Sequence, residues 1–369
     1  MQISQVEFYH ASLKLKQPFI TSLGYRDHAN NVFVRILTRE GLEGWGECSP
    51  YPPINGETVD TCFIIGKLLA EKLMGQDATD PAAHSQLMDK TIYGNTSIKS
   101  AIDIAIHDIA AKAEEKPLYA YLGGSIRKKV HTDYTVSVKD AEQMVADAIT
   151  VKERGFPVIK VKLGAGGEKD VERIKAIREA VGYDIGIRID ANQGWAVQEA
   201  IDTLKALEPY QIQYCEEPIS RHEYPSLKEV RKESPVLIMA DESVYDHHDA
   251  KKLINQGLCD MINIKLGKSS GLVKAQKIIT HAEAGKIPMQ IGGFLESRIL
   301  FTANCHLAHT SDLVQYFDFD SPLFMEDDPI TGGMQYHPDW EITLPDSPGL
   351  GITVAEEWLN QFRKLIIQG

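Results

Sequence analysis

The feature that most constrains the fold is a series of eight short apolar runs, which begin roughly 25 residues apart from residue 134 onward. Polar–apolar helical patterns, such as those over 168–180 and 197–207, separate most of the runs. Eight strand–helix repeats at this spacing predict a parallel (β/α)8-type barrel, with an open doubly wound sheet as the alternative. The runs span 134–138, 158–163, 185–189, 212–215, 236–240, 261–264, 287–291 and 313–317.

The sequence on either side of these repeats has a different pattern. Apolar stretches over 3–15, 31–37 and 43–48 predict strands, with a turn at Glu40-Gly41, and two helical patterns follow over 58–73 and 97–113. Strands followed by helices in separate blocks indicate an α+β unit. After the eighth run the sequence is loop-like and rich in Pro and Gly up to Leu350, which indicates that the last barrel helix is displaced and that the tail packs on the first domain.

Charge and composition narrow the function classes. The 369 residues include 39 basic and 52 acidic side chains, a net charge of −13, which argues against non-specific nucleic-acid binding. The longest apolar candidate, around 63–73, is interrupted by Lys67 and Lys72, so we expect no membrane span. Residues 1–6 lack a signal-peptide pattern, and five cysteines without a Cys-x-x-Cys pair indicate reduced thiols. We expect a cytoplasmic protein that forms a homo-oligomer.

Three acidic residues end three consecutive predicted strands: Asp190, Glu216 and Asp241. Active sites of such barrels lie at the carboxyl ends of the strands, so the three carboxylates are expected to converge at one mouth. Together they would repel one another unless a cation is bound, and an all-oxygen donor set favours a hard divalent ion such as Mg²⁺ or Mn²⁺. The alternative is three unrelated surface acids.

Two lysines flank the acids in strand order: Lys162 ends the second strand and Lys265 the sixth. Lys160 lies two residues before Lys162 and points to the same strand face. An ordinary lysine, with a pKa of about 10.4, is too basic to remove a proton at neutral pH, but nearby positive charge lowers its pKa. The sequence therefore favours two bases on opposite sides of a metal-bound substrate, with simple pairing to the acids as the alternative.

Taken in order and spacing, these motifs resemble those of the enolase superfamily, muconate-lactonising subgroup. The resemblance covers the whole chain, and it implies an α/β fold: a modified (β/α)7β TIM-type barrel with an N-terminal α+β capping domain completed by the C-terminal tail. We expect the capping domain over 1–125, the barrel over 126–325 and the returning segment over 326–369. The resemblance also implies that Asp190, Glu216 and Asp241 bind one Mg²⁺ per subunit, with Lys162 and Lys265 as the two acid/base groups. The matching motifs are Lys160-Val161-Lys162, Asp190-Ala191-Asn192-Gln193-Gly194-Trp195, Glu216-Glu217-Pro218, Asp241-Glu242-Ser243 and Asn263-Ile264-Lys265.

One further motif, Asp318-Phe319-Asp320, resembles the Asp-x-Asp signature of the dipeptide epimerases in that subgroup. There the pair holds the amino terminus of the substrate, and two carboxylates on one strand face suit an ammonium through charge-assisted hydrogen bonds. A second metal site or solvated acids are the alternatives. Thr135, on the first strand, also matches a substrate-contacting position of these epimerases, and Lys160 is expected to bind substrate as well.

The side-chain preference is predicted from what the pocket lacks. The alanyl-glutamate branch of these enzymes has an arginine in the first capping loop; alignment from Pro18-Phe19 places Gly24 at that position, while Arg26 lies two residues further on. The stretch 292–295, in which Gly293 and Leu295 are expected to contact substrate, offers an acidic side chain no positive charge. An apolar second residue is therefore favoured.

These observations predict an isomerase: a Mg²⁺-dependent dipeptide epimerase that inverts the α carbon of the C-terminal residue by proton transfer between two lysines. Alanyl-alanine and alanyl-valine are the expected kinds of substrate. One alternative is an o-succinylbenzoate synthase or N-acylamino-acid racemase of the same superfamily, whose substrates lack the ammonium. Another is a non-catalytic barrel that binds only a metal or a partner.

Overall fold

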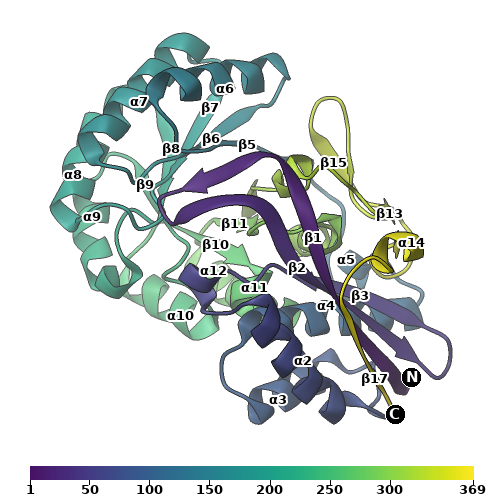
Figure 1. Cartoon of the computed structure of the whole chain (residues 1–369). Coiled ribbons are helices and arrows are strands. Elements are labelled where there is room, and N and C mark those ends of the chain that lie inside the picture. The colour runs from purple at the N-terminus through teal and green to yellow at the C-terminus, as the bar shows by residue number, and fades with distance from the viewer.

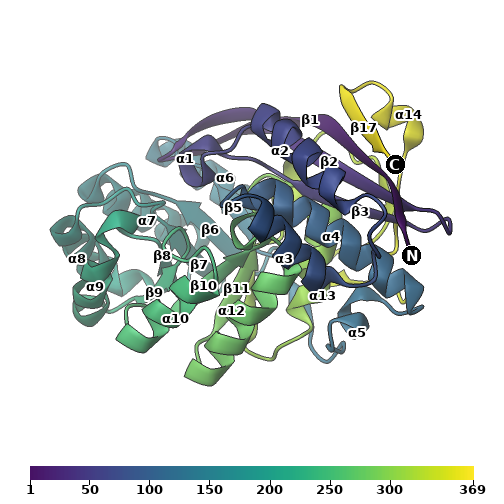
Figure 2. The ribbon, with the colours of Figure 1, turned by 90° about the horizontal axis from the view of Figure 1, so that it is seen from below.

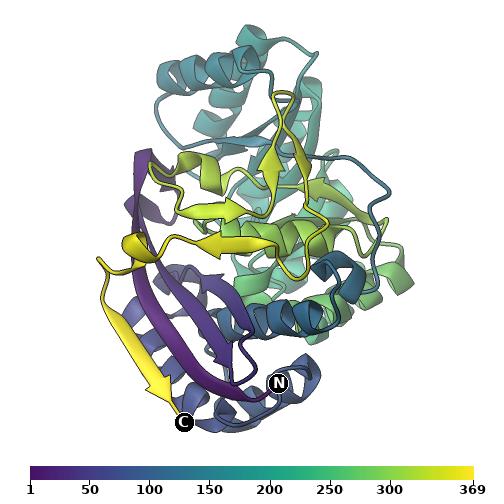
Figure 3. The ribbon, with the colours of Figure 1, turned by 90° about the vertical axis from the view of Figure 1, so that its right-hand side faces the viewer.

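The capping sheet is antiparallel, and its four strands combine both ends of the chain. The computed structural model describes all residues from 1 to 369. The sheet order is β17–β1–β2–β3, so the C-terminal strand lies beside the N-terminal one, as Figure 3 shows in yellow and purple. This arrangement confirms that the tail completes the capping domain. The strands are β1 (Ile3–Thr21), β2 (Gly24–Thr38), β3 (Glu43–Cys48) and β17 (Lys364–Gln368).

The hairpin of β1 and β2 is longer than predicted and reaches over the barrel (Figure 1). Strands were expected over 3–15 and 31–37, but the pairing continues to Thr21 and Gly24 at the hairpin tip. Lys14, Lys16 and Gln17 are exposed in this part. Without a buried face the apolar alternation that marks a strand is lost, which is why the sequence did not indicate the extension.

The capping helices pack on this sheet and along one side of the barrel (Figure 2). The patterns over 58–73 and 97–113 correspond to α2 and α4, which share a buried apolar cluster with the sheet. The predicted patterns did not include α3, which begins after an Asp80 N-cap. The helices are α1 (Pro52–Asn55), α2 (Val59–Leu73), α3 (Pro81–Thr91), α4 (Thr96–Ala113) and α5 (Leu118–Tyr121).

The eight predicted barrel strands are all present and form one parallel sheet in the order of the chain, which confirms the modified barrel and excludes a doubly wound sheet. They are β5 (Tyr134–Val136), β6 (Val158–Lys162), β7 (Gly186–Asp190), β8 (Ile212–Glu216), β9 (Leu237–Ala240), β10 (Met261–Lys265), β11 (Met289–Gly292) and β12 (Val314–Phe317). Seven helices of seven to fifteen residues follow the first seven strands: α6 (Ala141–Glu153), α7 (Gly167–Val181), α8 (Val197–Ala206), α9 (Leu227–Glu233), α10 (His247–Gln256), α12 (Leu272–Gly285) and α13 (Arg298–Ala308). A single turn, α11 (Leu266–Ser269), follows β10 directly.

No strand ladder joins the two ends of the sheet, β5 and β12. Two hydrogen bonds close this seam instead: the Thr135 N–H donates to Asp320 Oδ2 at 2.6 Å, and the Phe319 N–H donates to Thr132 Oγ1 at 3.0 Å. The residues that end β12 are therefore held beside the first barrel strand.

The C-terminal segment contains short strands where the sequence indicated only loops. They form a two-stranded and a three-stranded sheet, the latter with β4 (Val130–His131). Each strand has two or three residues, too few to show a period. The boundaries 1–125, 126–325 and 326–369 stay predictions. The elements of the C-terminal segment are β13 (Ile330–Gly332), β14 (Gln335–Tyr336), β15 (Glu341–Thr343), β16 (Ile352–Val354) and α14 (Glu356–Leu359).

None of the helices combines the length and the apolar character that a membrane-spanning segment needs.

Candidate active site

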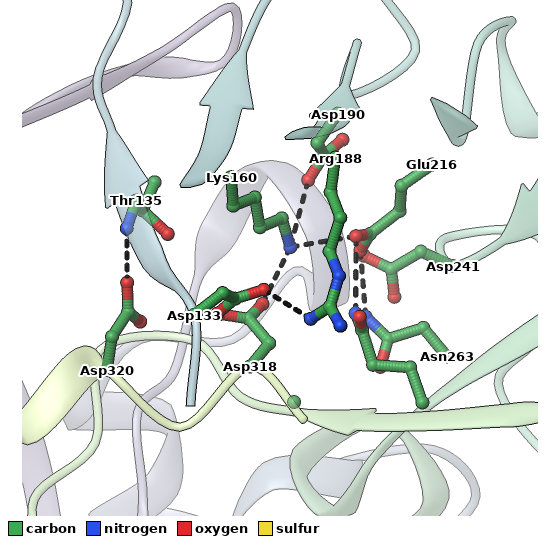
Figure 4. A network of polar contacts seen from close by, with 12 residues as sticks. Asp133, Thr135, Lys160, Arg188, Asp190, Glu216, Asp241, Asn263, Asp318 and Asp320 are labelled. Carbon is green, nitrogen blue, oxygen red and sulfur yellow. Dashed lines mark hydrogen bonds and ion pairs between the residues drawn. The ribbon is translucent and has the colours of Figure 1, made fainter. Parts of the chain in front are cut away.

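Three carboxylates converge at the carboxyl ends of the central barrel strands. Asp190 and Glu216 end β7 and β8 and are paired in register, while Asp241 directly follows β9. All three side chains are buried, with at most 1% exposure. Figure 4 shows them facing one another around the centre of the site. The convergence expected from the strand ends is therefore present.

Lys162 and Lys265 lie on opposite flanks of these acids, at the ends of β6 and β10. The Lys162 Nζ is 2.6 Å from Asp190 Oδ2, and the Lys265 Nζ is 2.7 Å from Asp241 Oδ2. Both lysines line the same pocket. A substrate in that pocket would have one lysine amino group on each side, the arrangement that two-base chemistry requires.

The carboxylates and lysines perturb each other's pKa. Burial lowers the pKa of Lys265, but the charges of Asp241 and Glu216 raise it more, so the net shift is upward. Burial raises the pKa of Glu216, but Lys160, Lys265 and Lys162 hold it well below its usual range. A lysine that acts as a base needs a low pKa, but the neighbouring carboxylates raise the pKa of Lys265. A cation that neutralises their charge removes the cause of the upward shift.

The donor set fits a hard divalent cation. Three buried carboxylates supply only oxygen ligands, which Mg²⁺ prefers. The Asp241 Oδ2 is buried and accepts no hydrogen bond, although the Lys265 Nζ is near. A buried carboxylate oxygen without a hydrogen bond carries a desolvation cost that a metal ligand bond would offset.

Lys160 lies beneath the pocket instead of lining it. Its side chain is fully buried, and its Nζ is 2.6 Å from Asp318 Oδ2 and 2.7 Å from Glu216 Oε2. Figure 4 shows it between the acids of β7 and β8 and those that follow β12. It therefore connects the two acidic groups electrostatically, and its predicted contact with substrate stays a prediction.

The remaining predicted substrate residues share the pocket of the two lysines. Asp318 and Asp320 follow β12, and the seam hydrogen bond to Thr135 fixes the Asp320 carboxylate at Oδ2. Neither Oδ1 atom of this pair accepts a hydrogen bond from the protein. The pocket is lined by every predicted contact except Lys160: Thr135, Gly293, Leu295, Asp318 and Asp320. The predicted roles of these residues stay predictions.

Several polar residues around the site were given no role from the sequence, although Asn263 belongs to one of the matching motifs. Arg188, two residues before Asp190 on β7, pairs with the buried Asp133 at 2.8 Å. Lys268, on α11, donates to Asp241 Oδ1, and Asn263 Nδ2 donates to Glu216 Oε1 at 2.7 Å. Strand alternation could have indicated Arg188 and Asn263, since each lies two residues from a chosen residue. The Lys268 contact depends on a one-turn helix without a sequence signal.

The hairpin tip supplies one wall of the pocket. Gly24 and Arg26 both line it, and the Arg26 guanidinium stacks over the Tyr51 ring, 4.0 Å from its centroid. Gly24 has a φ of +140°, which only glycine adopts without strain, so the tip would have to change shape to carry an arginine at this position.

Two protein families match the chain. The family described as mandelate racemase / muconate lactonizing enzyme, N-terminal domain, matches residues 3–123, and the Enolase C-terminal domain-like family matches residues 143–358.

Individual relatives match nearly the whole chain. A D-Ala-D/L-Ala epimerase of Cytophaga hutchinsonii is 50% identical, with 100% of both chains covered. The crystal structure of a dipeptide epimerase from that organism, complexed with Mg and D-Ala-L-Val, gives a TM-score of 0.99. An L-Ala-D/L-Glu epimerase of Bacillus subtilis is 36% identical over 96% of this chain and 98% of its own, and its substrate-liganded structure gives a TM-score of 0.93.

A hydrophobic dipeptide epimerase of Enterococcus faecalis is 37% identical over 96% of this chain and 100% of its own. The structure from that organism with Mg and L-Leu-L-Tyr gives a TM-score of 0.93. With these matches and both family domains present in order, the resemblance inferred from the motifs is confirmed: the chain belongs to the mandelate racemase / muconate lactonizing enzyme family of the enolase superfamily.

Proposed function

We propose that this protein is a Mg²⁺-dependent dipeptide epimerase that inverts the α carbon of the C-terminal residue. The observation that carries the proposal is that one pocket brings together Lys162, Lys265 and the pair Asp318 and Asp320. Two bases allow proton removal from one face and return on the other, and two carboxylates suit a free ammonium. The similar proteins are named as epimerases of dipeptides, which supports the same reaction class.

Each group has a separate task in the proposed reaction. Asp190, Glu216 and Asp241 would hold Mg²⁺, which when bound stabilises the negative charge that develops on the substrate carboxylate as the α-proton leaves. Lys162 and Lys265 act on opposite faces: the neutral one accepts the α-proton at Nζ, and the protonated one donates a proton from the other side. Asp318 and Asp320 bind the ammonium and thereby fix the peptide direction.

The second residue of the preferred dipeptide is small or apolar in this proposal. Gly293 and Leu295 offer no charge, and Arg26 is engaged with Tyr51. The relative from Cytophaga hutchinsonii is named for D-Ala-D/L-Ala, in agreement with a small side chain. Alanyl-alanine and alanyl-valine are therefore the first substrates to test.

The decisive experiment incubates L-Ala-L-Ala with the enzyme and Mg²⁺ in D₂O. We expect deuterium at the C-terminal α carbon and the appearance of L-Ala-D-Ala, read by mass spectrometry and chiral chromatography. Excess EDTA should abolish both, and added Mg²⁺ should restore them. Full turnover after verified metal removal would contradict the metal assignment, and the absence of any α-proton exchange would favour a non-catalytic barrel.

The control substrate separates this proposal from a racemase of N-acylated amino acids. N-Acetylalanine has the same reacting carbon but no ammonium for Asp318 and Asp320. We expect its kcat/KM to be at least about a hundredfold below that of Ala-Ala, since a lost charge-assisted contact is worth about 3 kcal/mol. Equal turnover of the two would favour the N-acylamino-acid racemase.

A further inference from the structure

A third buried carboxylate lies beside the pair that faces the ammonium. Asp133 precedes β5 and is 1% exposed. One carboxylate oxygen of Asp133, one of Asp318 and one of Asp320 lie within 4.8 Å of one another. The Asp133 Oδ2 is 2.8 Å from Arg188 Nη1, whereas its Oδ1 is buried and has no hydrogen-bond partner. Figure 4 shows Asp133 next to Asp318, with the Arg188 guanidinium close to both.

The charges of this group do not balance. Three carboxylates are in contact with two cations, Lys160 at Asp318 and Arg188 at Asp133, and Lys160 is shared with Glu216. One negative charge is therefore in excess on this wall of the pocket. A single monovalent cation would restore neutrality there, which matches one substrate ammonium.

A divalent metal fits this group less well than an ammonium. The Oδ2 atom of each carboxylate is already engaged, by Arg188, by Lys160 and by the Thr135 N–H, respectively. Hard divalent cations need several free oxygens, usually six or more ligands in total. An ammonium needs only a few acceptors, and the Oδ1 atoms of Asp318 and Asp320 are available at the pocket surface.

We propose that Asp133 is a positioning residue for the substrate ammonium: it holds the Arg188 guanidinium away from Asp318 and Asp320 and gives this wall its excess negative charge. The inference rests on the proposed dipeptide substrate. Arg188 donates only to Asp133, Gln213 and the Phe317 carbonyl, so Asp133 is its one anionic partner. Without Asp133, the buried guanidinium would compete with the ammonium for the nearby acids.

The acid–base properties of the group agree with this charge imbalance. Burial and the charge of Asp318 together raise the pKa of Asp133 to about 7. Burial and the charges of Asp318 and Asp133 raise the pKa of Asp320 well above its ordinary value. Carboxylates raise one another's pKa in this way when too few positive charges are present, and a bound ammonium would relieve the repulsion.

The test compares two ligands that differ only in the amino group. Calorimetry in the presence of Mg²⁺ measures the Kd of Ala-Ala and of propionyl-alanine, which is Ala-Ala without its amino group. Asp133→Asn should weaken Ala-Ala binding by at least about tenfold and leave propionyl-alanine within about twofold. Adding Arg188→Met removes the freed cation, so the double variant should recover most of the lost affinity for Ala-Ala.

Asp108→Asn is the matched control. Asp108 is fully buried and pairs with Lys112 at 2.9 Å on α4, away from the pocket. This variant should lose stability without changing the ratio of the two Kd values. A structural role for Asp133 predicts the same result as the control, namely equal effects on both ligands.

Each outcome decides the question. Equal loss for both ligands, no loss for Ala-Ala, or a double variant no better than the single one would overturn the inference. Should Asp133→Asn fail to fold, the charge-balanced double variant alone must bind Ala-Ala within about threefold of the native protein. If the native protein binds both ligands equally, the inference about Asp133 is also overturned. If the native protein prefers Ala-Ala but exchanges no α-proton, only the proposed epimerase activity is refuted.

Discussion

At the scale of single residues, Lys162 and Lys265 are similarly buried and line one pocket from the ends of β6 and β10. If each lysine serves one enantiomer, as the proposed mechanism requires, Lys162→Ala and Lys265→Ala should each reduce epimerisation at least about a thousandfold. Each variant should still exchange the α-proton of one diastereomer with retention. NMR of L-Ala-L-Ala and L-Ala-D-Ala in D₂O measures both. Epimerisation near the native rate in either variant would refute the two-base mechanism.

Also at this scale, Arg26 is the arginine that lines the pocket next to the hairpin tip. A carboxylate that enters the pocket must be left unpaired or must draw the guanidinium away from Tyr51, whose cation–π contact is worth about 0.5–2 kcal/mol. With the desolvation cost of the carboxylate, we expect kcat/KM for Ala-Glu to be about a hundredfold below that for Ala-Ala. Steady-state kinetics with both dipeptides measures this ratio.

The Arg26→Ala variant shows which role this arginine has. If Arg26 stays on Tyr51, its removal should leave the preference for Ala-Ala in place. A native preference for Ala-Glu that disappears in Arg26→Ala would show instead that the arginine binds the acidic side chain.

At the scale of elements, the capping sheet meets α4 backbone to backbone. A Cβ at Gly46 of β3 would lie 1.9 Å from the carbonyl oxygen of Ala101 on α4. The backbone of a packed helix cannot move away at low cost. We therefore expect Gly46→Ala to lower the free energy of unfolding by about 3 kcal/mol or more, measured by urea denaturation.

A matched glycine tests whether the close approach is the cause. A Cβ at Gly186, on β7, would meet the flexible end of Gln213 at 2.6 Å. Because that side chain can move, Gly186→Ala should cost less than about 1 kcal/mol. Similar losses of stability in the two variants would show that the backbone contact with α4 is not the cause of the loss in Gly46→Ala.

At the scale of the whole molecule, two buried acids lie where the capping domain meets the barrel. Glu47 of β3 accepts hydrogen bonds from Ser297 and Leu300 at the start of α13, and Glu296 is the residue before Ser297. Burial raises the pKa of Glu47 to about 7, and burial together with the charge of Glu47 raises that of Glu296 to about 8. We therefore expect the stability of this interface to depend on pH.

The sign of this dependence follows from proton binding. Between pH 5 and 8 the folded chain keeps protons that the unfolded chain, with ordinary carboxyl pKa values, has released, so stability falls as the pH rises. Between pH 5 and 8 the free energy of unfolding of Glu296→Gln should therefore fall less than that of the native protein, by a few kcal/mol. Urea denaturation midpoints at each pH measure this difference. Exposed Glu229→Gln should follow the native curve. Parallel curves for all three proteins would contradict the prediction.

The sequence by itself determined the barrel, the order of its strands and the residues at their ends. A strand–helix repeat has a period that local patterning records, and parallel strands must place their carboxyl ends at one mouth. The convergence of Asp190, Glu216, Asp241, Lys162 and Lys265 could therefore be predicted without knowledge of their distances, and their roles stay predictions. The Asp-x-Asp pair was selected from its place at the end of the last strand and its resemblance to a known motif, but β12 ends at Phe317, so the turn after the strand, and not strand alternation, brings both residues to the pocket.

Only the tertiary structure decided which charges compensate one another. Asp133 and Arg188 are 55 positions apart in the chain, and their pairing depends on how the open sheet curves until β5 meets the end of β12. The same holds for Arg26, whose place over Tyr51 depends on the reach of an exposed hairpin without an apolar pattern. Contacts between distant segments are set by packing of the whole chain, and local periodicity carries no record of them.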